Sequence, residues 1–127
     1  MGIHVIDDEV ALAELVFEAL EIEGYAPLQM FHSGISYLMH MQSADYQAPK
    51  VLITDLMMPG IDGLQLIKEI RSKHPEIKII VMSGRPDHLE QAEEADAALH
   101  KPFDFCLLYE QVEQLYHTGR GRCAGAA

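Results

Sequence analysis

The sequence has no tryptophan, two cysteines and few positive charges, and each scarcity excludes a class of protein. Cys106 and Cys123 lie far apart and match no Cys-x-x-Cys spacing, which favours neither a zinc site nor a disulfide scaffold and fits a reducing compartment. Nine Lys and Arg against 20 Asp and Glu leave a formal net charge of −11. Such a charge repels a phosphate backbone and argues against direct binding of nucleic acid.

Long hydrophobic runs are also missing. No apolar stretch approaches the length that spans a bilayer, and the chain begins with Ile-His-Val-Ile almost at once instead of a basic leader followed by a long apolar region. We therefore expect a cytoplasmic protein with no membrane partner.

The remaining composition is that of one soluble globular domain. The chain has 127 residues, of which 49% are hydrophobic and 23% charged, a balance that lets a domain bury a core. Residues 118–127 lack apolar periodicity, and we expect them to be a disordered tail or the start of a linker. The predicted domain is therefore residues 1–117.

Strand-like and helix-like patterns alternate along this domain. Short apolar runs predict strands at residues 3–6, 25–31, 50–54, 77–82 and 97–100. Amphipathic spacing predicts helices at 10–23, from a cap at Ser33 to about 45, at 64–73, at 87–95 and at 104–116. This alternation is typical of a parallel sheet with helices on both faces.

Polar side chains follow four of the five predicted strands. In chain order these are Asp7, Asp8 and Glu9; Thr54 and Asp55; Ser83 and Gly84; and His100, Lys101 and Pro102. In an open parallel sheet, the carboxyl ends of the strands form the crevice in which ligands bind. Acids, a hydroxyl and an amine are therefore expected to converge there.

This set of groups suits a divalent cation and a phosphoryl group. Carboxylates this close do not all stay ionised without a cation, and hard oxygen ligands without nearby cysteine favour Mg²⁺. Lys101, the Ser83 hydroxyl and backbone N–H groups near Gly84 suit phosphoryl oxygens, and aspartate is itself a nucleophile in phosphoryl transfer. Asp55, placed after a buried strand, is therefore the candidate acceptor.

At this point the motifs resemble those of response-regulator receiver domains of two-component signalling. The resemblance covers residues 2–117 and rests on Asp7-Asp8, on TDLMMPGIDG around Asp55, on MSG around Ser83 and on HKPF around Lys101. It implies a flavodoxin-like (βα)5 fold, with a five-stranded parallel sheet of order 2-1-3-4-5 and helices on both faces.

The resemblance also implies roles at the metal site. Asp55 would accept the phosphoryl group and Asp8 would bind Mg²⁺ directly. Asp7 would orient a metal-bound water, and Met57 would offer its backbone carbonyl to the metal.

Further roles are implied around the phosphoryl group. Ser83 would form a hydrogen bond with a phosphoryl oxygen beside Gly84, and Lys101 would pair with the phosphate. The peptide bond between Lys101 and Pro102 would be cis. The side chains of Met57 and Arg85 would flank the path of attacking water and so modulate the lifetime of the phosphate.

Two features depart from the family. Ala98 stands three residues before Lys101, where the family has Tyr or Phe, so the usual coupling of Ser83 to an aromatic ring is not expected. The interval from Ser83 to Lys101 is also about one helical turn shorter than is usual, which predicts a short or partly unwound fourth helix. Its acids, Asp87, Glu90, Glu93, Glu94 and Asp96, argue against the usual receiver dimer.

Three functions stay open from the sequence. The first is a receiver that takes a phosphoryl group from a histidine kinase or phosphotransfer protein and signals to a protein target or an output domain absent from this chain. Such a receiver catalyses only its own phosphorylation and dephosphorylation. The second is a pseudo-receiver that binds partners without phosphorylation, favoured by Ala98. The third is an aspartate-nucleophile phosphohydrolase, disfavoured because Asp7-Asp8 is not a DxD motif after the first strand.

Overall fold

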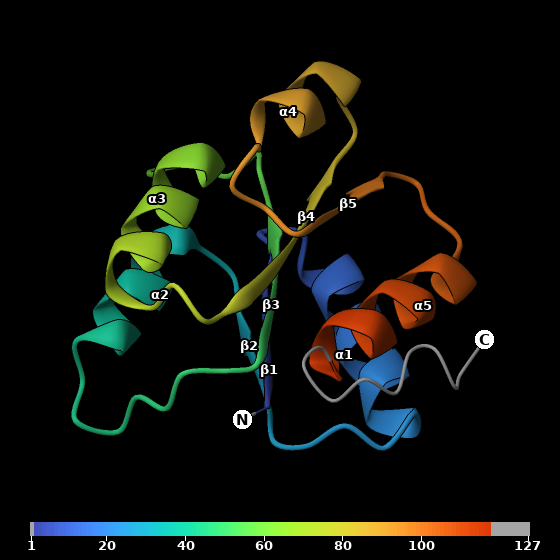
Figure 1. Ribbon diagram of the computed structural model, residues 1–127, viewed down its shortest axis with the longest axis horizontal. Helices are drawn as coiled ribbons and strands as arrows, with labels where there is room; N and C mark the ends of the chain where they lie inside the picture. Colours follow the sequence, from blue (N-terminus) through green and yellow to red (C-terminus); the bar gives the residue numbers. More distant parts are fainter. Residues whose placement is uncertain (1, 118–127) are drawn as a thin grey trace.

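The computed structural model describes residues 2–117, in which five strands alternate with five helices (Figure 1). The strands are β1 (Ile3–Ile6), β2 (Leu28–Phe31), β3 (Val51–Asp55), β4 (Lys78–Ser83) and β5 (Ala97–His100). The helices are α1 (Val10–Ile22), α2 (Gly34–Met41), α3 (Gly63–Lys73), α4 (Pro86–Gln91) and α5 (Phe105–Tyr116). None of these helices has the length and hydropathy of a membrane span.

The five strands form one parallel sheet of order β2-β1-β3-β4-β5. The order of the strands switches at β1, since β2 lies on one side of β1 and all later strands lie on the other. The predicted architecture and strand order are thus confirmed. The crevice between the carboxyl ends of β1 and β3 is where such sheets place a ligand site.

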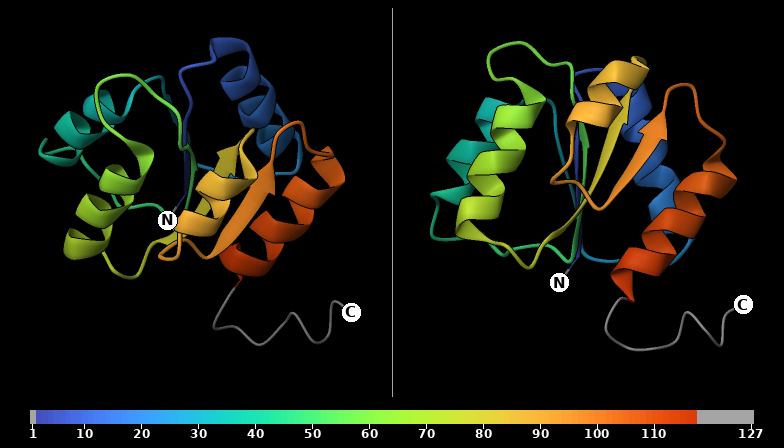
Figure 2. Two further views of the ribbon diagram at one scale, coloured as in Figure 1. Left: turned by 90° about the horizontal axis from the view of Figure 1, so that it is seen from above. Right: turned by 45° about the horizontal axis from the view of Figure 1, so that its top comes forward.

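Helices cover both faces of the sheet (Figure 2), as predicted. Helices α1 and α5 pack on one face, where Val16 and Leu108 join a core around Val5 and Ile53. Helices α2, α3 and α4 pack on the other, where Tyr37 and Ile67 contribute to the second core. Because both faces are covered, the central strands are apolar almost throughout.

Strand β3 delivers Asp55 from the middle of this sheet. All five of its residues are buried, and Asp55 is only 4% exposed. The loop after it is tied at both ends, since Leu56 N donates to Met82 O and Gly63 N donates to Leu56 O. A Cβ at Gly63 would lie 2.5 Å from Leu56 Cα, so only glycine allows this close return of the chain.

Two predicted elements are shorter in the structure. The strand predicted at 25–31 begins only at Leu28, because Tyr25 N still donates to Leu20 O of the preceding helix and Pro27 has no N–H to donate. The helix predicted to reach about residue 45 ends at Met41, where tighter turns close it through Gln42 N to Met39 O. Its predicted cap is confirmed, with Ser36 N donating to Ser33 Oγ.

The shortened fourth helix is confirmed, and it is shorter than the predicted range of 87–95. It ends at Gln91, and the following residues are drawn toward α3. Arg71 donates to Glu94 O from Nε at 3.1 Å and from Nη2 at 2.9 Å, and forms an ion pair with Asp96. The carbonyl of Glu94 is therefore committed to a side chain instead of to a further helical turn.

The remaining backbone predictions concern a proline and the C-terminal residues. The Lys101–Pro102 peptide bond is cis, as is Ala26–Pro27. The expected tail or linker at 118–127 lies outside the described residues, so the division into a domain at 1–117 and a tail stays a prediction.

Candidate functional site

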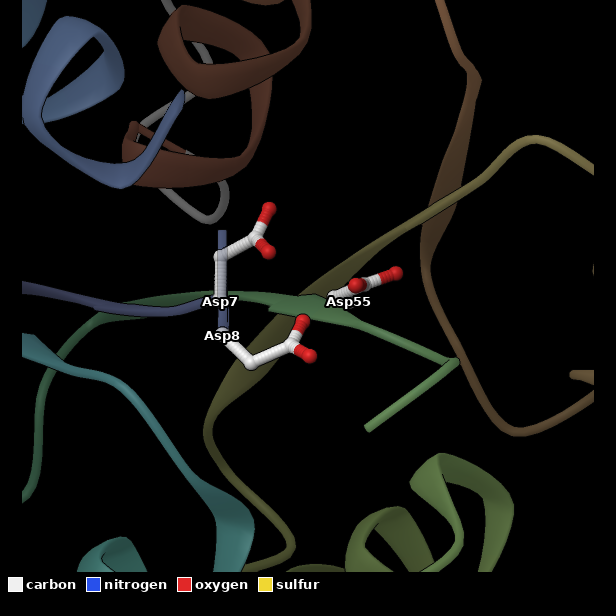
Figure 3. Close-up of side chains that lie close together, drawn as sticks. All are labelled: Asp7, Asp8 and Asp55. Carbon is white, nitrogen blue, oxygen red and sulfur yellow. The ribbon is translucent and has the colours of Figure 1, made fainter. Parts of the chain in front are cut away.

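Three carboxylates from two strands meet at the carboxyl edge of the sheet. Asp7 and Asp8 follow β1, and Asp55 is the last residue of β3, the strand that lies next to β1 in the sheet. Each offers a carboxylate oxygen, and these oxygens lie within 4.8 Å of one another. Figure 3 shows the three side chains around a common space. Asp7 is fully buried and Asp8 is exposed, so this space is open on the side of Asp8.

Lys101, which follows β5, reaches across to the same cluster. Its Nζ lies 3.1 Å from Asp7 Oδ2, 3.4 Å from Asp55 Oδ2 and 3.0 Å from Glu9 Oε1. Its side chain is 16% exposed, and that of Asp55 is 5% exposed. The ammonium group therefore offsets part of the negative charge from a half-enclosed position.

Burial and repulsion leave Asp55 hard to ionise. Burial raises the pKa of Asp55, the charge of Asp7 raises it further, and the opposing effect of Lys101 is too small to prevent a pKa of about 6. Burial acts to lower the pKa of Lys101, but the carboxylates of Glu9, Asp55 and Asp7 outweigh it and the pKa is raised. The cluster thus holds more negative charge than one ammonium group offsets.

These residues fit a magnesium ion. The donors are hard carboxylate oxygens at close quarters, and a cation among them removes the repulsion that raises the pKa of Asp55. The exposed side at Asp8 leaves space for the waters that Mg²⁺ retains. Met57, predicted to offer its carbonyl, follows directly in the loop, and its N–H donates to Asp55 Oδ1 at 3.3 Å.

Ser83 and its neighbours lie along the adjoining strand ends. Ser83 is fully buried at the end of β4, its carbonyl accepts from Lys101 N at 2.8 Å, and its Oγ accepts from Arg85 N at 3.0 Å. Since the hydroxyl oxygen is an acceptor there, its own hydrogen is available for a further acceptor. Gly84 is exposed, and the Arg85 guanidinium lies 3.4 Å from Asp87.

Sequence reasoning did not assign a role to Glu9. Its carboxylate makes the shortest of the three contacts of Lys101 Nζ, while its N–H donates to Asp7 Oδ1 at 2.9 Å. The signal was present as the third acid of the run Asp7-Asp8-Glu9. Its partner is 92 positions away, and no local pattern indicates which charge such a side chain reaches.

At the position of the missing aromatic ring, the structure has an exposed strand residue. Ala98 lies on β5, and its carbonyl accepts from Gln111 Nε2 of α5 at 3.3 Å. The polar contact between β5 and α5 is thus made by the backbone at Ala98 instead of by a side chain there.

Known proteins with similar sequences and structures form one family. The profile of the response regulator receiver domain matches residues 3–113. Response regulator MprA of Mycobacterium avium is 34% identical over 107 residues, which span 81% of this chain and 45% of that protein. DNA-binding transcriptional regulator NtrC of Escherichia coli K12 is 34% identical over 107 residues, which span 80% of this chain and 22% of that protein.

A solved structure is similar to the chain over most of its length. Response regulator TrrA of Thermotoga maritima, in complex with Mg²⁺-BeF, matches with a TM-score of 0.78 and 35% identity, over 89% of this chain and 96% of that one. The chain therefore belongs to the response regulator receiver domain family of two-component signalling. It spans less than half the length of the curated relatives MprA and NtrC.

Proposed function

We propose that the chain is a phosphoryl-accepting receiver, phosphorylated on Asp55 in a Mg²⁺-dependent reaction by a histidine kinase or a histidine phosphotransfer protein. The observation that carries the proposal is the convergence of Asp7, Asp8, Asp55 and Lys101 at one strand edge. The Mg²⁺-BeF complex of the related TrrA supports the choice of metal. The readout is proposed to be contact with a downstream protein or an output domain.

In the proposed transfer, a carboxylate oxygen of Asp55 attacks the phosphorus of a phosphohistidine. The new bond joins that oxygen to phosphorus, the nitrogen–phosphorus bond breaks, and the imidazole leaves with a proton from solvent. Lys101 Nζ, 3.4 Å from Asp55 Oδ2, pairs with a phosphoryl oxygen. Asp8, Asp55 and the Met57 carbonyl would hold Mg²⁺, and Asp7 would orient one of its waters. The ion would supply positive charge for the carboxylates and the phosphoryl oxygens.

The other strand ends complete the proposed site. The Ser83 hydroxyl donates to a phosphoryl oxygen, and the N–H of Gly84, the next residue, is proposed to donate to the phosphoryl group as well. The side chains of Met57 and Arg85 flank the approach of the water that hydrolyses the acyl phosphate, and so influence its lifetime. The protein catalyses only its own phosphorylation and dephosphorylation, and acts in the cytoplasm.

Incubation with acetyl phosphate tests the acceptor. We expect intact mass spectrometry to show a gain of one phosphoryl group with Mg²⁺ and no gain after chelation. Asp55→Asn removes the nucleophile and should abolish the adduct, whereas Asp62→Asn, an exposed carboxylate in the loop after β3, should retain it.

The opposite result would favour the second candidate function. If the wild-type protein gains no mass, and its NMR spectrum does not change when beryllofluoride is added, the chain is a pseudo-receiver that binds partners without phosphorylation. The absence of an aromatic ring at Ala98 is the observation behind that alternative.

A cleft beside Lys101 is suited to the protein donor. It has a volume of about 500 Å³ and lies between α1 and the segment after β5, with Leu12, Leu15, Phe103 and Phe105 among its lining residues. Leu15 is 54% exposed. An apolar cleft that reaches Lys101, which contacts the acceptor Asp55, offers a place for the helix that carries a phosphohistidine.

A charge at Leu15 should separate the protein donor from the small-molecule donor. We expect Leu15→Glu to slow phosphoryl transfer from a phosphorylated histidine-containing donor protein by about tenfold or more, and to leave the rate with acetyl phosphate within about twofold of wild type. Ile22→Glu is the matched control, since Ile22 is 82% exposed on the same helix and does not line the cleft. Equal losses with both donors would place the effect at the site itself and reject the cleft as a docking surface.

A further inference from the structure

A groove runs between α3 and α4, on the face opposite α1 and α5. Two hollows, of about 520 Å³ and 350 Å³, share Leu64 and Gln91 and are therefore continuous. Its apolar lining comprises Met57, Met58, Ile61, Leu64, Ile67 and Ala92. Met57 is 48% exposed, which leaves an unbranched, adaptable side chain at the surface.

The short fourth helix leaves this groove open. Helix α4 has six residues and none of them is buried. The segment after it turns away toward Arg71. The Arg71 side chain donates to the Glu94 carbonyl and forms an ion pair with Asp96. No further turn of α4 covers the groove at Ala92. The groove therefore combines accessible apolar side chains with polar groups at its rim, which is the arrangement that receives the apolar face of an amphipathic helix.

The rim of the groove is acidic. Asp62, Glu93 and Glu94 line it, against one lysine, Lys68. Within residues 2–117, the side chains of Glu93 and Glu94 take part in no ion pair. An occupant with positive charge would therefore meet carboxylates that have no competing partner.

The charge of the chain narrows the choice of occupant. A second copy brings the same acids and the same formal net charge of −11, so two copies repel each other at this rim. Nucleic acid and anionic lipid are repelled for the same reason. A basic segment of a different protein has the complementary charge, and apolar residues along one side of it match the lining.

We propose that the α3–α4 groove is the docking site for a basic amphipathic segment of a partner protein. Apolar side chains of the segment pack on Met57, Leu64 and Ala92, and its Lys or Arg residues pair with Glu93 and Glu94. The groove shares a wall with the candidate phosphorylation site, because Met57 N donates to Asp55 Oδ1. The docked segment therefore lies against the loop that follows Asp55.

A synthetic peptide tests the groove directly, with the full chain and without phosphorylation. The probe is a fluorescein-labelled helical peptide with leucine on one face and lysine on the other, titrated at physiological salt. One control peptide has glutamate in place of every lysine, and another has the same composition in scrambled order. We expect binding of the first peptide only, with amide shifts in the NMR spectrum of the protein confined to residues 56–68 and 88–94.

Paired charge reversals identify the rim. The double variant Glu93→Lys, Glu94→Lys should weaken binding about three- to tenfold, since it replaces two attractive contacts with repulsive ones at exposed positions, where each contact contributes little. The matched control Glu14→Lys, Glu18→Lys changes the net charge equally on exposed positions of α1, and should weaken binding less than about twofold.

Several outcomes would overturn the proposal that the groove is a docking site. Equal losses in the two double variants, or equal binding of the scrambled peptide, would mean unspecific attraction to an acidic protein. Amide shifts on another face would mean that the peptide does not bind in the groove. A dimer of the free protein that protects the groove amides would mean that a second copy occupies it; either result would reject a basic partner. None of these readouts requires phosphorylation of Asp55, so this proposal and the proposed function fail separately.

Discussion

Lys101→Met is expected to slow phosphorylation of Asp55 by acetyl phosphate by about 10²-fold or more. Methionine keeps a long unbranched side chain but removes the only ammonium group within 3.4 Å of both Asp7 and Asp55 in the described residues. The phosphoryl oxygens then lose the charge that pairs with them during transfer. The measurement is the initial rate of mass gain at saturating Mg²⁺.

A second lysine on the surface provides the control. Lys73→Met removes an equal charge from the exposed end of α3, and its rate should stay within about twofold of wild type. A near-normal rate in Lys101→Met would show that the ammonium group has no part in the transfer. The Lys101→Met variant should also lose about 2 kcal/mol of stability without Mg²⁺, because the fully buried carboxyl group of Asp7 loses this partner.

Asp55→Asn is expected to stabilise the protein in the absence of Mg²⁺. The pKa of Asp55 is raised from 3.8 to about 6 by burial and by Asp7. Ionising it therefore costs up to about 3 kcal/mol more in the folded state than in the unfolded chain. Asparagine carries no charge and incurs no such cost, so at pH 8 the variant should melt several degrees above wild type.

The pH dependence follows from the direction of this shift. Because the folded pKa is raised, the folded state binds more protons than the unfolded state between pH 3.8 and 6. The penalty is fully present above the folded pKa and disappears as the pH falls through this window toward 3.8. The stability difference between variant and wild type should vanish over the same range.

Magnesium and a surface variant complete this experiment. Added Mg²⁺ should raise the melting temperature of wild type more than that of Asp55→Asn, since the proposed Mg²⁺ site of the folded state includes the Asp55 carboxylate. Asp45→Asn, at an exposed position after α2, should melt within about a degree of wild type throughout. A variant that melts below wild type at pH 8 would contradict a repulsive cluster.

Most of the fold could be predicted from local sequence patterns. The segments Ile3–Ile6 and Val51–Asp55 are buried throughout because both faces of the sheet are covered, and their largely apolar residues without alternation predict a parallel sheet. The strand ends then placed Asp7, Asp55 and Lys101 at one edge, because parallel strands end on the same side. These predictions depend on the chemistry of short segments, which a sequence states directly.

Boundaries that depend on distant partners did not follow from such patterns. The fourth helix ends at Gln91 because Arg71, on another helix, takes the Glu94 carbonyl. The second strand begins at Leu28 for a local reason, because Tyr25 N still donates to Leu20 O at the end of α1. The first boundary thus involves a partner 23 positions away, and the second depends on how the preceding helix closes.

The sequence by itself determined the class of fold, the acid cluster and the candidate acceptor, since each follows from residue type and position at a strand end. Only the tertiary structure decided that Glu9 contacts Lys101 across 92 positions, and that a short α4 leaves an acidic groove beside Met57. Charges act through space, and grooves arise from the packing of whole elements. Neither is a property of any segment alone.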